Sequence, residues 1–484
     1  MADKHFDAVF IRTSLTSLAA AALLAKEGRS ILLLEPFGGL EQDGPHRPFH
    51  GFLGPLLYFG YEGGGAVEGY FRALSFPIPN LQKNGLRYEK VSPQLQIVLP
   101  SHRINLYLNE AAYLDELKRE YGKQAEKLKI LFDQVERDSA GFYPFLGQYH
   151  PLEIFGMGDR LGEWKKQLDF SQVVRAQQRI VASDLLSQYN FTSDLRDYFS
   201  LLTRFAFRKS LSEVSAFDFL RLFSSLKKGG VRIRGGYPVL ATFFHHLIEA
   251  RGGSIKAGKN VIRTEKQGKE LVKIFLSDGQ SVSATRFIVS QPSPHSRLDF
   301  FFTIPHRLIP IPMKEYLLMT WGGRRPPVIH DLLVLQLEPP QLEPPVENRD
   351  SYPKTRKLTV SIFLKRTREI SKRDYQLLES QVVERLNWLI PFSQSEIHPV
   401  GPPGIQDLRA EGTENNVFPS SEGKSEKRLR QREILRGAAS YFQAADLKNV
   451  YILKSDQSDT ISWGSSFIAG IHLAKRIDPT SRPS

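Results

Sequence analysis

This chain of 484 residues contains no cysteine. Disulfide bonds, cysteine-ligated metals, iron–sulfur clusters and thiol chemistry are therefore excluded. No run of about 18 apolar residues is present, so we expect no transmembrane helix. A basic N-terminal segment followed by an apolar one is also missing, which predicts no secretory signal. We therefore expect a cytoplasmic protein, either free or attached peripherally to a membrane.

Glycine is missing from one turn where it would be most informative. Residues 7–11 read as a short buried strand, and Leu15–Lys26 read as a helix rich in Ala and Leu. Residues 31–35 then read as a second buried strand that ends in an acid, Glu35. This pattern is typical of the βαβ unit of a dinucleotide-binding domain, whose first turn usually reads Gly-x-Gly-x-x-Gly. Here all three glycines are replaced.

Each replacement has a physical consequence. Arg12 must form the tight turn with a long side chain, and its guanidinium either fills the phosphate site or grips a phosphate. Ser14 places a hydroxymethyl group where a pyrophosphate approaches the helix amides. Ser17 is small enough for the helix to pack closely on the strand. Glu35 either meets the ribose or is a solvated acid at a strand end.

Later segments continue the same pattern. Gly235 and Gly236 follow an arginine and lead into a helix. The remaining segments are a helical stretch over 241–250, strands over 271–276 and 282–290 that turn at Asp278-Gly279, a strand over 449–453 and a helix over 464–476. This set, in this order, resembles the phytoene desaturase-like branch of the FAD-dependent amine oxidase superfamily.

The resemblance implies an α/β fold with two interleaved domains. One is an FAD-binding, Rossmann-like domain of the amine-oxidase type, expected over residues 1–85, 225–292 and 440–484. The other is an α+β substrate-type domain, expected over residues 86–224 and 293–439. Within the second, the sequence predicts helices over 109–139, 194–207 and 373–389 and strands over 88–99, 316–319, 331–336 and 357–364.

The resemblance also implies a set of cofactor contacts, most of them altered. Gly38 and Gly39 keep the family's Gly-Gly turn, but Leu40 stands where an arginine belongs. Lys454 and Ser455 replace a Gly-Asp or Gly-Glu pair, and Val261 would frame the adenine through its backbone. The full set is Arg12, Ser14, Ser17, Glu35, Gly38, Gly39, Val261, Lys454 and Ser455. With three separate contacts altered, we expect no bound cofactor, and retained FAD is the alternative.

No catalytic side chains are predicted. The chain offers no Ser/His/Asp set, paired-carboxylate site or metal cluster, and in the family the flavin performs the chemistry. His245 and His246 are adjacent on a predicted helix, so they project about 100° apart and cannot share a metal. We expect them to be surface or packing residues.

The net charge is +13, and the sequence pI is about 9.6. Such a balance favours an acidic partner, and no nucleic-acid motif accompanies it. The densest basic segment, 424–432, is predicted to begin an exposed helix that runs to about Phe442. We expect a protein partner, with an intact flavoprotein relative as one candidate; an anionic membrane surface or a lipid is the alternative. Pro-rich segments at 338–345 and 401–404 and the polar stretch 405–426 are predicted loops.

Together these patterns predict a non-catalytic pseudoenzyme of this family that serves as a structural or regulatory subunit of a complex. Two alternatives stay open. One is an active FAD-dependent desaturase, isomerase or oxidase of a lipophilic or amine substrate. The other is a carrier that binds a lipid without redox chemistry.

Overall fold

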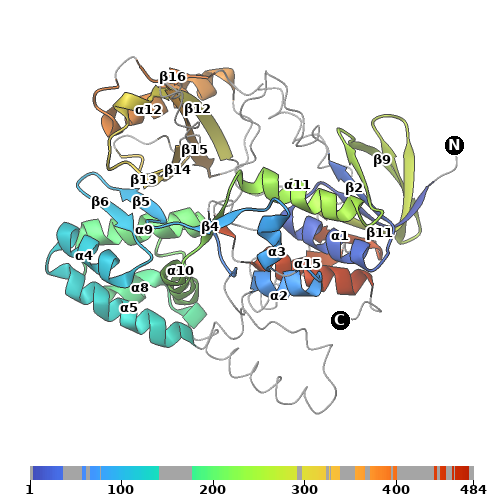
Figure 1. The fold of residues 1–484 in the computed structure, drawn as a ribbon, viewed down its shortest axis with the longest axis horizontal. Coiled ribbons are helices and arrows are strands. Elements are labelled where there is room, and N and C mark those ends of the chain that lie inside the picture. Colours follow the sequence, from blue (N-terminus) through green and yellow to red (C-terminus); the bar gives the residue numbers. More distant parts are fainter. Residues whose placement is uncertain are drawn as a thin grey trace, which may run out of the picture.

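The computed structural model describes most of the chain. The described residues are 4–35, 57–61, 66–76, 78–140, 177–290, 297–322, 326, 329–337, 355–365, 371–393, 396–400, 441–443, 447–453, 461–462 and 464–478. They form three β-sheets and a set of helices. In Figure 1 the largest sheet and its helices lie at one end of the molecule, and a group of helices lies at the other.

The largest sheet has eight strands, and its parallel part runs in the order β18-β11-β1-β2-β8. Strand β17 adds an antiparallel edge, and β9 and β10 extend antiparallel from β11. These strands are β1 (His5–Ile11), β2 (Ile31–Glu35), β8 (Ser254–Ala257), β9 (Val261–Gln267), β10 (Glu270–Leu276), β11 (Ser281–Ser290), β17 (Tyr441–Gln443) and β18 (Val450–Leu453). A parallel sheet with the first strand at its centre is typical of dinucleotide-binding domains.

Both faces of this sheet are covered, which explains why β1 and β2 are apolar without alternation. Ala8 and Phe10 of β1 belong to one core cluster, while Val9 and Ile11 belong to another. The first cluster includes residues of three helices: α1 (Leu15–Lys26), α11 (Gly236–Glu249) and α15 (Ser465–Ile477). The second cluster is completed by residues of β9 and β10.

Helices α1 and α15 lie in very close contact (Figure 1). A Cβ atom added at Gly470 of α15 would lie 2.7 Å from Cβ of Ala19 and 3.1 Å from the backbone nitrogen of Ala20. The alanine run of α1 supplies the small side chains that this approach needs, and all residues from Leu15 to Ala25 are buried. The N-terminus of α1 is thereby fixed at the edge of the sheet.

The second sheet has seven strands in the order β16-β12-β15-β14-β13-β5-β6. Its strands are β5 (Leu95–Val98), β6 (Arg103–Leu106), β12 (Arg297–Pro305), β13 (Tyr316–Met319), β14 (Ile329–Leu337), β15 (Thr355–Leu364) and β16 (His398–Pro399). Helix α12 (Lys372–Leu389) contributes to the core of this sheet. A small third sheet, in the order β19-β3-β7-β4, consists of β3 (Leu57–Tyr58), β4 (Tyr88–Lys90), β7 (Val231–Ile233) and β19 (Ile461–Ser462).

The other helices mostly gather around an aromatic core away from the largest sheet. Rings of Phe199, Phe219 and Phe223 contact one another there, with centroids 4.6 to 5.7 Å apart. The helices of this group are α4 (Glu110–Tyr121), α5 (Gln124–Ala140), α8 (Ala182–Ser187), α9 (Ser193–Phe207) and α10 (Ala216–Lys228). Helices α2 (Ala66–Ala73) and α3 (Ile78–Lys83) instead contribute to the core of the largest sheet, and the short 3₁₀ helix η1 (His306–Leu308) packs on the core of the second sheet. None of the described helices has the length and apolar character needed to cross a membrane.

The expected α/β fold is confirmed, and its opening strand, helix and strand occur where the sequence predicts them. One expectation is wrong. The basic helix was predicted to reach Phe442, but residues 441–443 form β17, whose backbone pairs with β18 at the sheet edge. The segments 338–345, 401–404 and 405–426 and the basic segment 424–432 lie outside the described residues.

Candidate functional site

The carboxyl ends of three parallel strands bring the predicted cofactor residues to one edge of the largest sheet. Strand β1 ends at Ile11 and leads through the Arg12 turn into α1, β2 ends at Glu35, and β11 ends at Ser290. Ligands of open α/β sheets bind at this edge, beside the first helix. We therefore call Arg12, Thr13, Ser14, Ser17 and Glu35 the dinucleotide edge.

The Arg12 turn keeps a glycine-like backbone. Arg12 has a φ of 60°, in the left-handed region, and its amide donates to the carbonyl of Leu34 at 3.0 Å. For a residue with a Cβ atom this conformation costs about 1–2 kcal/mol. The first glycine of the family turn is therefore replaced in sequence, but its conformation is retained.

Ser14 and Ser17 cap the N-terminus of α1, because each side chain binds the other residue's backbone amide. Ser14 is the N-cap, and its Oγ accepts from the Ser17 amide at 3.2 Å. The Ser14 amide in turn donates to Oγ of Ser17 at 2.6 Å, which completes a capping box. Oγ of Ser14 also lies 3.2 Å from Oγ of Ser290. Two of the amides that would bind a pyrophosphate are thus satisfied by the chain's own hydroxyls.

Glu35 is buried and held by two partners that the sequence did not indicate. Thr13 Oγ1 donates to its Oε1 at 2.8 Å, and Nε2 of His245, on α11, lies 2.9 Å from the same oxygen. Burial opposes the negative charge, but the contacts with His245 and Thr13 outweigh it, so the pKa of Glu35 is lowered. Its charged form is therefore the stable one at neutral pH.

His245 was expected to be a surface or packing residue, but it faces the key acid. A histidine 210 positions away from Glu35 gives no local pattern, so only the fold could reveal the contact. Thr13 lies between two of the altered turn positions, at a place where the glycine pattern specifies no residue. The described residues contain no group of three or more potential metal ligands.

Val261 lies beside the same edge. It is buried as the first residue of β9, and the amide of nearby Lys259 donates to the Glu35 carbonyl at 3.3 Å. The chain from β8 to β9 therefore borders Glu35, as the adenine-framing role of Val261 requires. The remaining predicted contacts, Gly38, Gly39, Lys454 and Ser455, lie outside the described residues, as does Leu40.

The residues of the dinucleotide edge fit FAD, although fewer backbone amides remain to donate hydrogen bonds to its phosphates. Breaking the serine cap costs about 0.5–2 kcal/mol, while a micromolar ligand binds with about 8 kcal/mol. The cap therefore weakens phosphate binding without excluding it. The amides of Leu15 and Thr16 have no hydrogen-bond partner among the described residues. A carboxylate accepts about four hydrogen bonds, so Glu35 keeps acceptor sites for ribose hydroxyls.

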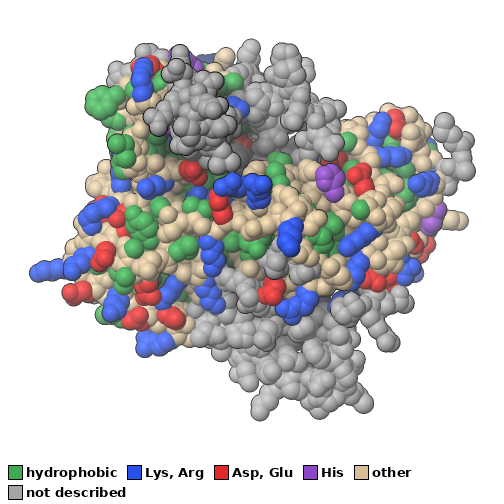
Figure 2. Space-filling model, viewed as in Figure 1, with side chains coloured by type: hydrophobic (Ala, Val, Ile, Leu, Met, Phe, Trp, Pro, Cys, Tyr) green, Lys and Arg blue, Asp and Glu red, His purple; other side chains and the backbone are tan. Residues whose placement is uncertain are grey.

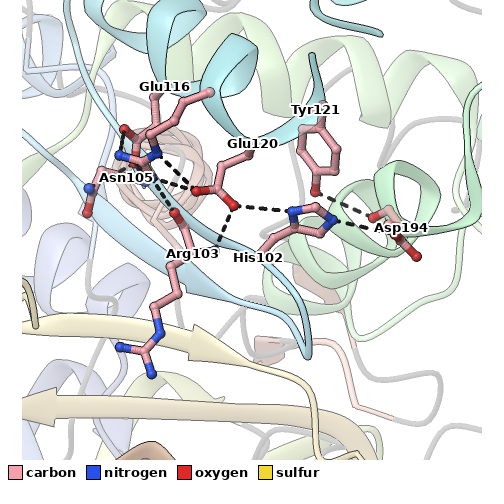
Figure 3. Close-up of polar contacts among 8 residues, drawn as sticks. His102, Arg103, Asn105, Glu116, Glu120, Tyr121 and Asp194 are labelled. Atoms are coloured by element: carbon pink, nitrogen blue, oxygen red, sulfur yellow. Dashed lines mark hydrogen bonds and ion pairs between the residues drawn. The ribbon is translucent and has the colours of Figure 1, made fainter. Parts of the chain in front are cut away.

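A second polar cluster lies at the other end of the molecule (Figure 3). His102 lies between two acids, with Nδ1 3.2 Å from Oε2 of Glu120 and Nε2 3.4 Å from Oδ2 of Asp194. The ring of Tyr121 packs on it at 4.6 Å, and Arg119 pairs with Glu120 at 2.8 Å. Both imidazole nitrogens are occupied, so none faces a substrate. The cluster joins the start of β6 and the C-terminal end of α4 to the N-terminal end of α9.

The exposed face in Figure 2 carries no single-sign patch. Lys and Arg side chains are spread over it and interspersed with Asp and Glu.

Known proteins that resemble this chain include flavin-dependent oxidoreductases, whose cofactor domain would have the parallel strand order described above. The sequence profile of flavin containing amine oxidoreductases matches residues 87–315. All-trans-retinol 13,14-reductase of Homo sapiens is 27% identical over 304 residues, which cover 56% of this chain and 46% of that protein. The chain thus spans about half the length of the curated relative that it matches.

Two solved structures share the fold over nearly the whole chain. Wild-type putrescine oxidase bound to putrescine is 12% identical, with a TM-score of 0.54 over 98% of this chain and 99% of that chain. An oxidoreductase from Methanosarcina mazei is 12% identical, with a TM-score of 0.53 over 97% of this chain and 99% of that chain. The chain is therefore similar in sequence to flavin containing amine oxidoreductases over residues 87–315, and it shares the overall fold of these two solved structures.

Proposed function

We propose that this chain is an FAD-dependent oxidoreductase that acts on a lipophilic or amine substrate. The observation that carries the proposal is the retained geometry of the dinucleotide edge: a left-handed turn at Arg12 opposite the buried, charged Glu35. The family profile supports the redox class. The named relatives support the substrate class, since one is a retinol reductase and another a putrescine oxidase.

Three residues of the dinucleotide edge, Arg12, Thr13 and Glu35, have a role in this proposal, together with His245 and two amides of α1. Glu35 binds the ribose hydroxyls, and His245 and Thr13 hold its carboxylate in place. The amides of Leu15 and Thr16 bind phosphate oxygens, with the Arg12 guanidinium adding positive charge. When bound, FAD supplies the redox chemistry, so the chain needs no side-chain nucleophile.

A second candidate is the non-catalytic subunit predicted from the sequence. The observation that favours it is the capping box, because Ser14 and Ser17 satisfy amides that a pyrophosphate would otherwise use. In that case the fold serves as a surface for a protein partner or as a carrier for a lipid. An acidic partner would suit the net charge of +13, and its binding would weaken with salt.

Flavin content decides between these candidates. The purified protein should carry flavin absorbance, or bind added FAD in a calorimetric titration with about one site. Glu35→Gln should weaken this binding, while exposed Glu270→Gln in β10 should not. A colourless protein that takes up no FAD at saturating concentration would reject the enzyme and favour the subunit or carrier. Copurified protein or extracted lipid would then separate those two.

A further inference from the structure

Five tyrosines cluster where the small third sheet meets its neighbours. Tyr58 and Tyr61 come from β3 and the residues after it, Tyr88 from β4, Tyr237 from α11 and Tyr316 from β13. The rings of Tyr58 and Tyr61 are 6.4 Å apart, and those of Tyr61 and Tyr88 are 5.4 Å apart. We call this set the tyrosine cluster.

Two hydroxyls of this cluster are buried without a partner. Tyr58 is 1% exposed and Tyr61 is 7% exposed. Neither hydroxyl makes a hydrogen bond within the described part of the chain. Elsewhere a similar residue is satisfied, because the Tyr70 hydroxyl donates to the Ala19 carbonyl at 2.9 Å. Buried polar groups are normally paired, so two unpaired neighbours indicate a missing partner.

The hydroxyls of Tyr58 and Tyr61 are affected by burial and by neighbouring tyrosines. Burial raises the pKa of Tyr58 well above its usual value, and the neighbouring hydroxyls of Tyr61, Tyr237 and Tyr316 raise it further. Burial likewise raises the pKa of Tyr61, with a smaller contribution from Tyr88. No charged side chain contributes to either shift. The guanidinium of Arg232, on the neighbouring strand β7, lies 3.8 Å from the centre of the Tyr316 ring and 3.5 Å from the Glu315 carboxylate, which neutralises its charge.

The cluster also adjoins the dinucleotide edge. Burial raises the pKa of Tyr237, and the charge of Glu35 raises it further, so Tyr237 lies within electrostatic reach of that acid. Strand β19 pairs with β3 in a register that sets Ser462 opposite Tyr58, two residues before Gly464, the N-cap of α15. The unpaired hydroxyls therefore lie between the dinucleotide edge and the second sheet.

We propose that the tyrosine cluster is a binding site for the hydroxyl or carbonyl oxygen of a neutral, lipophilic ligand, held by Tyr58 and Tyr61. A neutral oxygen is favoured because an ionised group in this apolar setting would lack a counter-charge. A ligand hydroxyl can accept from one tyrosine and donate to the other. The site does not depend on the proposed redox function, since none of its groups belongs to the dinucleotide edge.

The first test measures the melting temperatures of three tyrosine variants by calorimetry without ligand. Tyr58→Phe and Tyr61→Phe remove hydroxyls that have no partner, so the melting temperature should stay the same or rise. Tyr70→Phe removes a paired hydroxyl and should lower it. The proposal would be overturned if Tyr58→Phe and Tyr61→Phe both lowered the melting temperature as much as Tyr70→Phe does. Such a result would mean that the protein itself supplies hydrogen-bond partners to the Tyr58 and Tyr61 hydroxyls.

The second test uses geraniol, with geranic acid and geranylamine as charged probes of the same carbon skeleton. Calorimetric titration in the absence of FAD should detect geraniol binding and a loss of about tenfold for each of Tyr58→Phe and Tyr61→Phe. Tyr70→Phe should bind geraniol as the unaltered protein does. Equal binding of the charged probes, no geraniol binding, or unchanged affinity in both cluster variants would contradict the proposal. Because FAD is absent, these results do not depend on whether the flavin proposal holds.

Discussion

At the residue scale, the altered turn shows that a left-handed backbone conformation can be present where the glycine that favours it is replaced. Arg12 adopts the left-handed φ of 60° that glycine usually supplies. The lost glycines predicted a lost cofactor, because Arg12 and Ser14 restrict the approach of a phosphate to the backbone. A side chain in the left-handed conformation is also costly. The pattern alone could not show that the turn is kept at that cost.

The capping box leads to a prediction for Ser14→Gly. Glycine is nearly as good an N-cap as serine, so stability should change by only a few tenths of a kcal/mol. The variant removes a hydroxymethyl group and frees the Ser17 amide, so FAD affinity should rise by up to about tenfold, as about 1.4 kcal/mol implies. Calorimetric titration measures it. Asn109→Gly, an N-cap change at α4, is the matched control and should leave affinity unchanged.

Glu35 should make stability depend on pH in acid. Its pKa is lowered in the folded protein, because contacts with His245 and Thr13 outweigh the effect of burial. The stabilisation is therefore present above the usual glutamate range and is lost as pH falls through the folded pKa. Denaturant unfolding of Glu35→Gln should show a deficit at pH 7 that shrinks toward pH 3. Thr13→Val should reduce the same pH dependence, and a deficit constant with pH would contradict this explanation.

At the element scale, most strands and helices could be predicted from periodicity. Buried β1 and β2, the hairpin of β10 and β11, and α9 and α12 all occur at their predicted places. Strand β17 could not be predicted in this way, because three residues are too few to show a hydrophobic period. Their strand conformation depends on pairing with β18. For the same reason, the sequence could not show that Thr13 and His245 contact Glu35, because these contacts form only in the tertiary structure. The domain bounds stay a prediction.

The contact of α1 with α15 should be the most size-sensitive helix contact near the dinucleotide edge. Gly470→Ala would place a methyl group 2.7 Å from Cβ of Ala19 and 3.2 Å from the carbonyl oxygen of Thr16. Because backbone atoms must move, we expect a loss of about 1–3 kcal/mol in denaturant unfolding. Gly69→Ala in α2 has no atom within 4 Å and should be neutral or stabilising. Equal effects of the two would refute the close-packing explanation.

At the scale of the whole molecule, the largest sheet is assembled from distant parts of the chain. Its strands come from residues 5–35, 254–290 and 441–453, and α15 packs on α1 from residues 465–477. A ligand at the dinucleotide edge would touch elements from the first two segments, beside a helix from the last. Binding there should therefore stabilise the cooperative unit rather than one loop.

The melting temperature should accordingly rise with FAD concentration. A ligand at 100 times its dissociation constant stabilises the native state by about 2.7 kcal/mol. The proposed function has Glu35 and the α1 amides bind the adenosine and phosphate half of FAD, so ADP should also raise the melting temperature and compete with FAD. FMN lacks the adenosine and should have a smaller effect. If FAD and ADP leave the melting temperature of the unaltered protein unchanged but raise that of Ser14→Gly, the capping box is what prevents binding in the unaltered protein. No shift in either protein would leave the fold as a non-catalytic surface.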